Sequence, residues 1–250
     1  MQTEQNRQPQ TPDTGTAAPE KALENFWYHY KWPTLIIAFF VLFFLIAFAQ
    51  MGAKPKYDAH LLYVGPTYLD GEVVADILAS VDRAADQAYD ITENPADYSG
   101  DGMLNCDFNK IVYVPTMTAE EYKENDIYFN GVENLNARGQ FDNLIMIGEY
   151  VVLMIEQSLY DETVTTGAFC KLSDLLGYVP ENAYDECGIL LADLPICAEN
   201  GFRQLPDNTV VCCRGKSYVN NFNKNVQEDA LYDAQVELFR QIVSYQRNAE

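Results

Sequence analysis

The stretch Leu35–Ala49, LIIAFFVLFFLIAFA, contains fifteen residues and no polar side chain. The nearest charged residues are Lys31 and Lys54, which leaves an uncharged segment at 32–53. A helix rises about 1.5 Å per residue, so this segment spans roughly 33 Å and can cross a hydrocarbon core of about 30 Å. A soluble helix needs only one apolar face, whereas this one is apolar on every face. We therefore predict a transmembrane helix, which includes Leu35, Phe39, Phe43 and Ala47.

Aromatic residues precede this helix in the stretch Phe26–Trp32, FWYHYKW. Aromatic rings with polar edges favour the headgroup layer, and the Lys31 side chain can extend toward it. His29 is assigned to this aromatic belt rather than to a metal or catalytic site. Pro33 is expected in the first turn of the helix, where its missing N–H costs little. The aromatic belt and transmembrane helix together occupy residues 26–53.

The segment before the belt predicts a disordered cytoplasmic arm at 1–25, because residues 1–20 are rich in Gln, Thr, Pro and Ala without apolar periodicity. A short arm before one anchor and a long domain after it favour a cell-membrane protein with its N-terminus inside and residues 57–250 outside. The numbers of positive charges before and after the anchor are nearly equal, so they do not decide its orientation. The alternative is a signal peptide cleaved after Ala47-Phe48-Ala49, although the arm is long and carries acidic residues.

Most of the acidic charge lies beyond the anchor. The chain has a formal net charge of -21, and residues 53–250 contain 13 basic and 33 acidic residues, a net of -20. Such a surface repels phosphate backbones, so nucleic-acid binding is excluded. It also disfavours lying flat on an anionic membrane. The lipid bilayer is therefore expected as a partner only of the N-terminal helix.

Residues 57–250 alternate between predicted strands and predicted helices, which indicates a single α/β domain with a mostly parallel or mixed sheet covered by helices. The predicted strands are 59–66, 110–115, 150–155, 188–192 and 209–213. The predicted helices are 70–89, 118–123, 130–148, 158–163 and 227–247, while 90–105 and 193–208 are predicted loops.

Two of these helices have predicted core faces. The helix 130–148 is expected to turn inward the residues Val132, Leu135, Phe141, Leu144 and Ile145. The helix 227–247 is expected to bury Leu231, Val236, Phe239, Ile242 and Val243.

Six cysteines allow two interpretations. An even number in an exported domain permits disulfides. However, Cys170 and the pair Cys212-Cys213 lie in apolar surroundings, where thiols pack as small hydrophobes. Buried free thiols are the favoured interpretation, and Cys187 with Cys197 is the first disulfide to test. The chain has neither a CxxC motif nor a Cys/His spacing that suits zinc.

Motifs for catalysis and cofactors are missing from the sequence, which contains no GxSxG, P-loop or GxGxxG. His60 lies on a predicted strand and is assigned to the core or the strand end. Asp193 follows a strand, where α/β folds place sites, but a loop-capping role is favoured. Arg203 could meet an anionic ligand, although an ion pair with Glu199 or Asp207 is favoured. We predict no catalytic residue, metal ligand or cofactor, and we expect the acidic loop containing Asp97, Asp101 and Asp107 to be solvated rather than calcium-bound.

The order of elements from residue 130 onward resembles part of a type 2 extracytoplasmic solute-binding protein. The matching pieces are a helix at 132–148, the buried strand YVVLMI (150–155), the short helix at 158–162, the turn TGAF (166–169), the segment KLSDLL (171–176) and GILLADLP (188–195). The whole chain, with its FWYHYKW belt, is also similar to uncharacterised single-pass membrane proteins of Gram-positive anaerobes. Solute-binding proteins of this type have two lobes and well over 300 residues, whereas the domain at 57–250 is much shorter. A ligand cleft between two lobes is therefore not expected in this chain.

The expected function is therefore that of a membrane-anchored, non-enzymatic domain that binds a ligand or a protein partner outside the cell. The alternative is a structural or assembly component of a membrane complex. A deep pocket would favour ligand binding, and an exposed apolar patch would favour docking of a protein.

Overall fold

The computed structural model describes residues 19–52, 56–89, 93–115, 130–216 and 226–246. The chain divides into two compact units, Met1–Pro55 and Lys56–Glu250. The predicted arm at 1–18 and the predicted helix at 118–123 lie outside the described residues.

The first unit contains one helix, α1 (Pro19–Gly52). Within it, Tyr30–Phe48 is long and apolar enough to cross a membrane, a property that an N-terminal signal sequence shares. Residues 19–25, predicted to belong to a disordered arm, are helical, because residues such as Glu20, Ala22 and Leu23 favour helix. Pro33 consequently lies inside the helix and not in its first turn.

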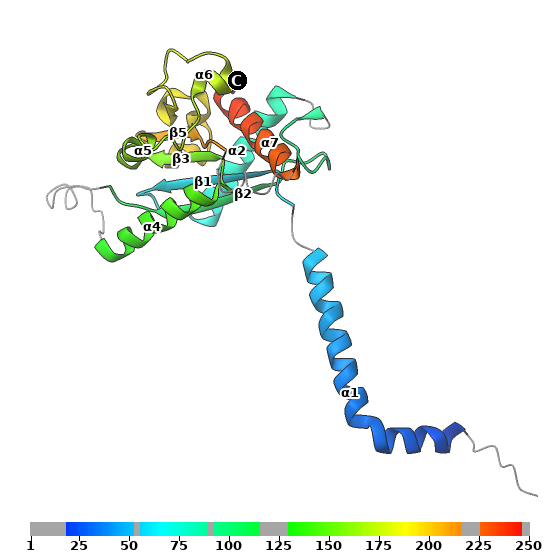
Figure 1. Cartoon of the computed structure of the whole chain (residues 1–250). Helices are drawn as coiled ribbons and strands as arrows, with labels where there is room; N and C mark the ends of the chain where they lie inside the picture. Colours follow the sequence, from blue (N-terminus) through cyan, green and yellow to red (C-terminus); the bar gives the residue numbers. More distant parts are fainter. Residues whose placement is uncertain (1–18, 53–55, 90–92, 116–129, 217–225, 247–250) are drawn as a thin grey trace, which may run out of the picture. The chain divides into compact units, whose positions relative to one another are not determined.

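The second unit contains a five-stranded mixed sheet, so the predicted α/β class is confirmed (Figure 1). Its strand order is β2-β1-β3-β5-β4, with bounds β1 (Ala59–Gly65), β2 (Cys106–Val112), β3 (Val152–Glu156), β4 (Gly188–Leu190) and β5 (Thr209–Cys213). β1 pairs in parallel with both β2 and β3, whereas β5 is antiparallel to β3 and β4.

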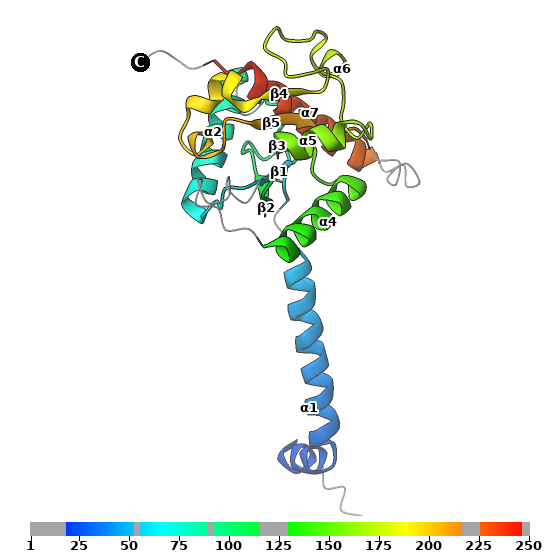
Figure 2. The same cartoon turned by 90° about the vertical axis from the view of Figure 1, so that its left-hand side faces the viewer.

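Helices cover both faces of this sheet (Figures 1 and 2). One face packs against α2 (Gly71–Ala88), α6 (Leu172–Leu176) and α7 (Val226–Ser244). The other face packs against α4 (Gly131–Ile147) and α5 (Gln157–Val164). Alternation along the strands explains the two cores, since Val152 and Met154 join the first cluster while Leu153 and Ile155 join the second.

Helix ends are defined by the residue types that favour them. The Asp70 carboxylate accepts hydrogen bonds from the N–H groups of Glu72 and Val73, both at 2.9 Å, and so begins α2. Asn130 caps α4 in the same way, and Gly148 ends α4 in the left-handed region with φ 84°. The predicted start of α2 and both predicted ends of α4 are therefore confirmed.

Four strand boundaries differ from the prediction by two or more residues. β2 ends at Val112 rather than Pro115, and β3 begins at Val152 rather than Tyr150. β2 begins at Cys106 rather than Lys110, because its parallel register with β1 extends to the pair Ala59 and Cys106. β4 ends at Leu190 rather than Ala192, since Leu191–Asp193 turns into a 3-10 helix.

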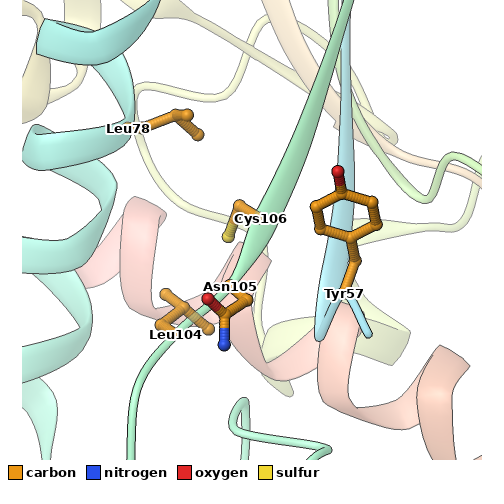
Figure 3. A pocket seen from close by; sticks show the side chains of 5 residues that line it. All are labelled: Tyr57, Leu78, Leu104, Asn105 and Cys106. Carbon is orange, nitrogen blue, oxygen red and sulfur yellow. The ribbon is translucent and has the colours of Figure 1, made fainter. Parts of the chain in front are cut away.

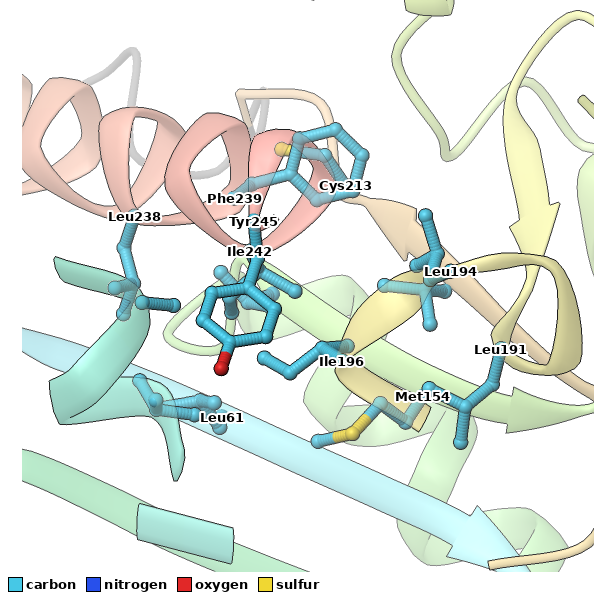
Figure 4. Packing of buried hydrophobic residues seen from close by; sticks show 14 of the residues in the cluster. Leu61, Met154, Leu191, Leu194, Ile196, Cys213, Leu238, Phe239, Ile242 and Tyr245 are labelled. Carbon is cyan, nitrogen blue, oxygen red and sulfur yellow. The ribbon is translucent and has the colours of Figure 1, made fainter. Parts of the chain in front are cut away.

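The predicted loop 193–208 contributes apolar residues to the core. Two 3-10 turns, Pro195–Ala198 and Phe202–Gln204, turn apolar side chains inward. Figure 4 shows Leu194 and Ile196 of this segment among residues of α7 and the sheet. Leu194, Ile196, Phe202 and Leu205 are all at most 4% exposed. The predicted core stripe of α7 is mostly confirmed, with Val236, Phe239 and Ile242 buried and Leu231 and Val243 half-buried.

The predicted core face of α4 was wrong at its N-terminal end. Phe141 is fully buried, but Val132 is 70% exposed and Leu135 is 73% exposed. These two residues lie one turn apart on the side of α4 away from Phe141. The helix therefore has apolar residues on two sides, and the sheet covers one of them.

Candidate functional site

The outer side of α4 carries a row of exposed, uncharged residues. They recur at spacings of three and four, which places them along one face of the helix. We call this row the α4 docking face and define it as Val132, Leu135, Asn136, Gly139, Asn143 and Ile147, all exposed. Side chains at such positions cannot pack against the sheet, because Ala137 and Phe141 occupy the opposite side.

The α4 docking face is held in place by contacts on the inner side of the helix. The Asn134 side chain bonds the backbone after β2 twice, accepting from Val114 N–H at 2.8 Å and donating to Val114 C=O at 3.0 Å. Phe141 inserts into the core formed with Leu62 and Leu153. The helix is thus fixed by polar and apolar contacts, and its outer face is presented on a rigid element.

The rim of the α4 docking face is acidic. Glu133 and Asp142 are exposed, and the only cation among the described residues of α4 is Arg138. Arg138 pairs with Asp142 at 3.1 Å and also with Glu162 of α5. The hydrogen bonds that the guanidinium donates to Glu162 and to Asp142 raise its pKa, against the opposing effect of burial. The rim therefore keeps a net negative charge beside an uncharged centre.

In α/β sheets, ligands usually bind at the edge formed by the carboxyl ends of parallel strands, where the chain continues to opposite sides of one strand. In this sheet that strand is β1, which lies between β2 and β3. The residue at this edge of β3 is Glu156, which is 3% exposed. Its Oε2 accepts from Ser158 Oγ at 2.5 Å and from Leu159 N–H at 3.1 Å, while Oε1 accepts from Asn208 Nδ2 at 3.2 Å. These bonds make Glu156 the N-cap of α5, so this carboxylate is structural.

The end of β1 at the same edge is filled by a side chain. A Cβ added to Gly65 would lie 2.5 Å from Tyr63 Oη. The Tyr63 hydroxyl accepts from Thr67 N–H at 3.2 Å, and burial raises its pKa. The Tyr63 ring therefore occupies the space where a ligand would meet the backbone of β1.

A small pocket opens at the other end of β1 and β2 (Figure 3). Its volume is about 230 Å³, and Tyr57, Leu78, Leu104, Asn105 and Cys106 line it. Ligand pockets usually measure about 300–1,000 Å³. Burial and nearby carboxylates raise the pKa of Cys106, so this thiol is not an activated nucleophile. This pocket gives little support to small-ligand binding.

Asp193 and Arg203, both singled out from the sequence, line one shallow hollow of about 490 Å³ with Cys197. Asp193 belongs to a 3-10 helix, and its backbone C=O accepts from Asn182 Nδ2 at 2.8 Å. The predicted ion pair of Arg203 with Glu199 or Asp207 is not found among the described residues, where Glu199 pairs with Arg83 at 2.8 Å. The hollow is nearly flat and brings opposite charges together at the surface.

The remaining polar candidates have local partners. His60 is half-buried at the start of β1, and its Nδ1 lies 3.3 Å from Asp107 Oδ2. Asp107 belongs to β2 rather than to the acidic loop. Asp97 accepts from Gly100 N–H at 2.7 Å and from Gly102 N–H at 2.8 Å. The part of the chain that the structure describes contains no group of three or more His, Cys, Asp or Glu arranged to hold a metal.

The first disulfide to test, Cys187 with Cys197, does not form, and both cysteines are free thiols. Cys187 packs against the core that contains α4 and α5, whereas Cys197 packs against the core on the opposite face of the sheet. The two thiols are therefore separated by the sheet. The sequence showed that Cys212 and Cys213 are adjacent in a strand, which places their side chains on opposite faces. It gave no indication that Cys170 lies beside Cys213.

The four predicted transmembrane residues lie together on α1. Leu35, Phe39 and Phe43 are 51%, 63% and 56% exposed, and Ala47 is half-buried. The rings of Phe39 and Phe43 stack with centroids 6.5 Å apart. Their outward position suits contact with lipid.

Comparisons with protein-family models, with curated proteins and with solved structures find no match to this chain. The functional argument therefore depends on the residues and their geometry.

Proposed function

We propose that this chain is a single-pass membrane protein whose non-enzymatic C-terminal domain lies outside the cell and docks a protein partner through the α4 docking face. The observation that carries the proposal is the row of exposed Val132, Leu135 and Ile147 with no charge among them, on a domain of net charge near -20. Burying a Val, Leu or Ile side chain contributes about 1.5–3 kcal/mol. A partner that covers this row gains that energy without desolvating a charge.

The chemistry of the face indicates the chemistry of the partner. Gly139 lies in the middle of the row, and a Cβ added there would have no atom within 4 Å. The absence of a side chain lets another helix approach closely. The rim keeps a net negative charge, because Glu133 adds to Asp142 and Glu162, which share one cation, Arg138, and this charge favours basic residues opposite it. We therefore propose a partner helix with an apolar stripe flanked by Lys or Arg.

A second copy of this chain fits the face less well. Two copies would bring acidic rims together, and like charges across an interface oppose association. The acidic rim also disfavours an anionic lipid surface as the occupant.

Anchoring and orientation are part of the proposal. The length and composition of Tyr30–Phe48 support a helix that enters the membrane, and we propose that it is retained as an anchor. The order α4, β3, α5, a turn at Gly167, α6 and β4 agrees with the order expected from the resemblance to solute-binding proteins. On this proposal the domain is a reduced single lobe that binds a protein in place of a solute.

The alternative is a permanent structural component of a membrane complex. Permanent interfaces usually bury about 2,000–5,000 Å². The α4 docking face is one row on a 17-residue helix, which suits a smaller, transient contact. The small size of the α4 docking face therefore favours transient docking of a partner over a permanent interface.

The test is photo-cross-linking with the full chain in lipid nanodiscs. p-Benzoylphenylalanine replaces Leu135, or as a matched control it replaces Ala79, an exposed residue of α2. Each protein is mixed with solubilised membranes of the source organism, irradiated and digested, and the cross-linked peptides are sequenced by mass spectrometry. We expect a peptide with an apolar helical stripe and basic flanks from the Leu135 position alone. Its yield should fall when Glu133→Gln and Asp142→Asn reduce the charge of the rim.

Three outcomes contradict the proposal. A cross-linked peptide from this same chain would indicate a homodimer. Equal capture from the Ala79 position would indicate non-specific contact. No cross-link from Leu135 would remove the α4 docking face from consideration.

A further inference from the structure

Cys170 and Cys213 lie directly opposite each other on neighbouring backbone segments. Phe169 and Arg214 form an antiparallel bridge next to β5. On one side of it Cys170 N–H donates to Cys213 C=O at 2.8 Å, and on the other Gly215 N–H donates to Ala168 C=O at 2.9 Å. This pattern makes Cys170 and Cys213 the next facing pair, with both side chains on one face of the sheet.

Burial agrees with this arrangement. Cys213 is fully buried in the core beneath α7, and Cys170 packs against the same core. Phe169, the neighbour of Cys170, joins the core on the opposite face. The two thiols therefore share one environment, in which the Cys213 thiol donates to Arg214 C=O at 3.8 Å and the Cys170 sulfur lies beside the Tyr232 hydroxyl.

The backbone spacing at this position suits a disulfide. Facing residues of antiparallel strands have Cα atoms about 4.5–5.5 Å apart, within the range of about 4.4–6.8 Å that disulfides span. Disulfides have a preferred Cα separation of about 5.5–6 Å. Closing the bond therefore requires rotation of two side chains and no large movement of the backbone.

The surroundings of Cys170 make it the more reactive of the two. The neighbouring Cys213 thiol and then the Tyr232 hydroxyl lower the pKa of Cys170 to about 6, against the opposing effect of burial. The Tyr232 Oη lies 3.3 Å from the Cys170 sulfur. Of the nearby charges, Asp174 of α6 raises this pKa and Arg214 lowers it. Cys170 is half-buried whereas Cys213 is 0% exposed, so a reagent reaches Cys170 first.

We propose that Cys170 and Cys213 are a redox pair, in which Cys170 attacks an external disulfide and Cys213 then closes an intramolecular disulfide. The oxidant is a low-molecular-weight disulfide such as glutathione disulfide. The Cys170 thiolate attacks one sulfur of the oxidant, forms a mixed disulfide and releases one glutathione thiolate. Cys213 then attacks the Cys170 sulfur, and its proton passes to the second departing glutathione. Two protein thiols are oxidised and one disulfide is reduced to two thiols.

The closed pair would join the segment before α6 to β5, and would withdraw the Cys170 sulfur from Tyr232. The Tyr232 hydroxyl would keep its hydrogen bond to Arg214 C=O, at 3.0 Å. This redox step uses residues on the face of the sheet opposite α4 and does not depend on the proposed docking function.

The experiment uses the full chain in nanodiscs, fully reduced and then incubated with glutathione disulfide. Free thiols are alkylated, and disulfide-linked peptides are mapped by mass spectrometry. We expect a linkage between the Cys170 and Cys213 peptides in the wild type. In Cys213→Ala, glutathione should remain attached to Cys170. Cys197→Ser serves as the control, because this half-buried cysteine lies elsewhere and its loss should change neither product.

The wild-type map decides the proposal even where a variant does not fold. A linkage between other cysteines, such as Cys187 and Cys212, would overturn it. Glutathione attached equally to Cys197 and Cys170, or no linkage at all, would also overturn it.

Discussion

Replacement of Gly139 by alanine tests whether the centre of the α4 docking face is exposed helix. Glycine in an exposed helix interior is less favourable than alanine by about 0.8–1.0 kcal/mol. A Cβ at Gly139 meets no atom within 4 Å, so no steric cost offsets this gain. We therefore expect Gly139→Ala to raise the free energy of unfolding by about 1 kcal/mol. For a domain of this size, the melting temperature should rise by roughly 2–4 °C.

The measurement is thermal and urea unfolding of the full chain in nanodiscs, followed by far-UV circular dichroism. Gly188→Ala is the matched control. A Cβ at Gly188 would lie 2.5 Å from Val210 Cγ1 and 2.7 Å from Tyr160 Oη, so this variant should lose about 1–3 kcal/mol. Loss of stability in Gly139→Ala would refute the exposed position of Gly139, because it would reveal atoms packed against that side of α4.

A second variant separates docking from folding. Gly139→Gln also improves helix propensity, yet its long side chain fills the space into which a partner helix would pack. Stability should therefore be kept or increased while the cross-linking yield from position Leu135 falls. Unchanged yield would show that no helix approaches α4 at Gly139.

Three further predictions concern other parts of the domain. Oxidation of Cys170 and Cys213 closes a loop of intermediate length and should stabilise the domain by about 4 kcal/mol, seen as a higher denaturation midpoint that is absent in Cys213→Ala. Alkylation of reduced Cys170 by iodoacetamide should level off above neutral pH, since its lowered pKa leaves it mostly thiolate there, and Cys213→Ala should move this profile to higher pH. Asp58→Ala should destabilise by about 1–3 kcal/mol in urea unfolding, because it leaves the N–H groups of Ser99 and Asn105, each donating to Asp58 at 2.7 Å, without an acceptor. An unchanged midpoint in Asp58→Ala would contradict the role of this buried carboxylate.

The sequence predicted those elements whose signals are local. β3 was recognised from its run of apolar residues, and every one of its residues is buried. The start of α2 followed from Asp70, because a carboxylate caps N–H groups only two and three residues away. An anchor-like helix likewise follows from the composition of 35–49 alone.

Features that depend on distant residues were not predictable in this way. The extension of β2 to Cys106 depends on pairing with β1, and the inward packing of Leu194 and Ile196 depends on where α7 lies. The suggested Cys187–Cys197 pair failed because sequence spacing gives no information about which face of a sheet a loop residue meets.

The candidate sites likewise combine features set by local sequence with features set by contacts between distant residues. The sequence by itself determined that residues 130–148 contain a helix that ends at Gly148, and that the domain is strongly acidic. Only the tertiary structure decided that Phe141 faces the sheet while Leu135 faces outward, because one sheet covers one side of a helix. The meeting of Cys170 with Cys213 was likewise decided by the tertiary structure, since a backbone bridge joins residues far apart in the chain.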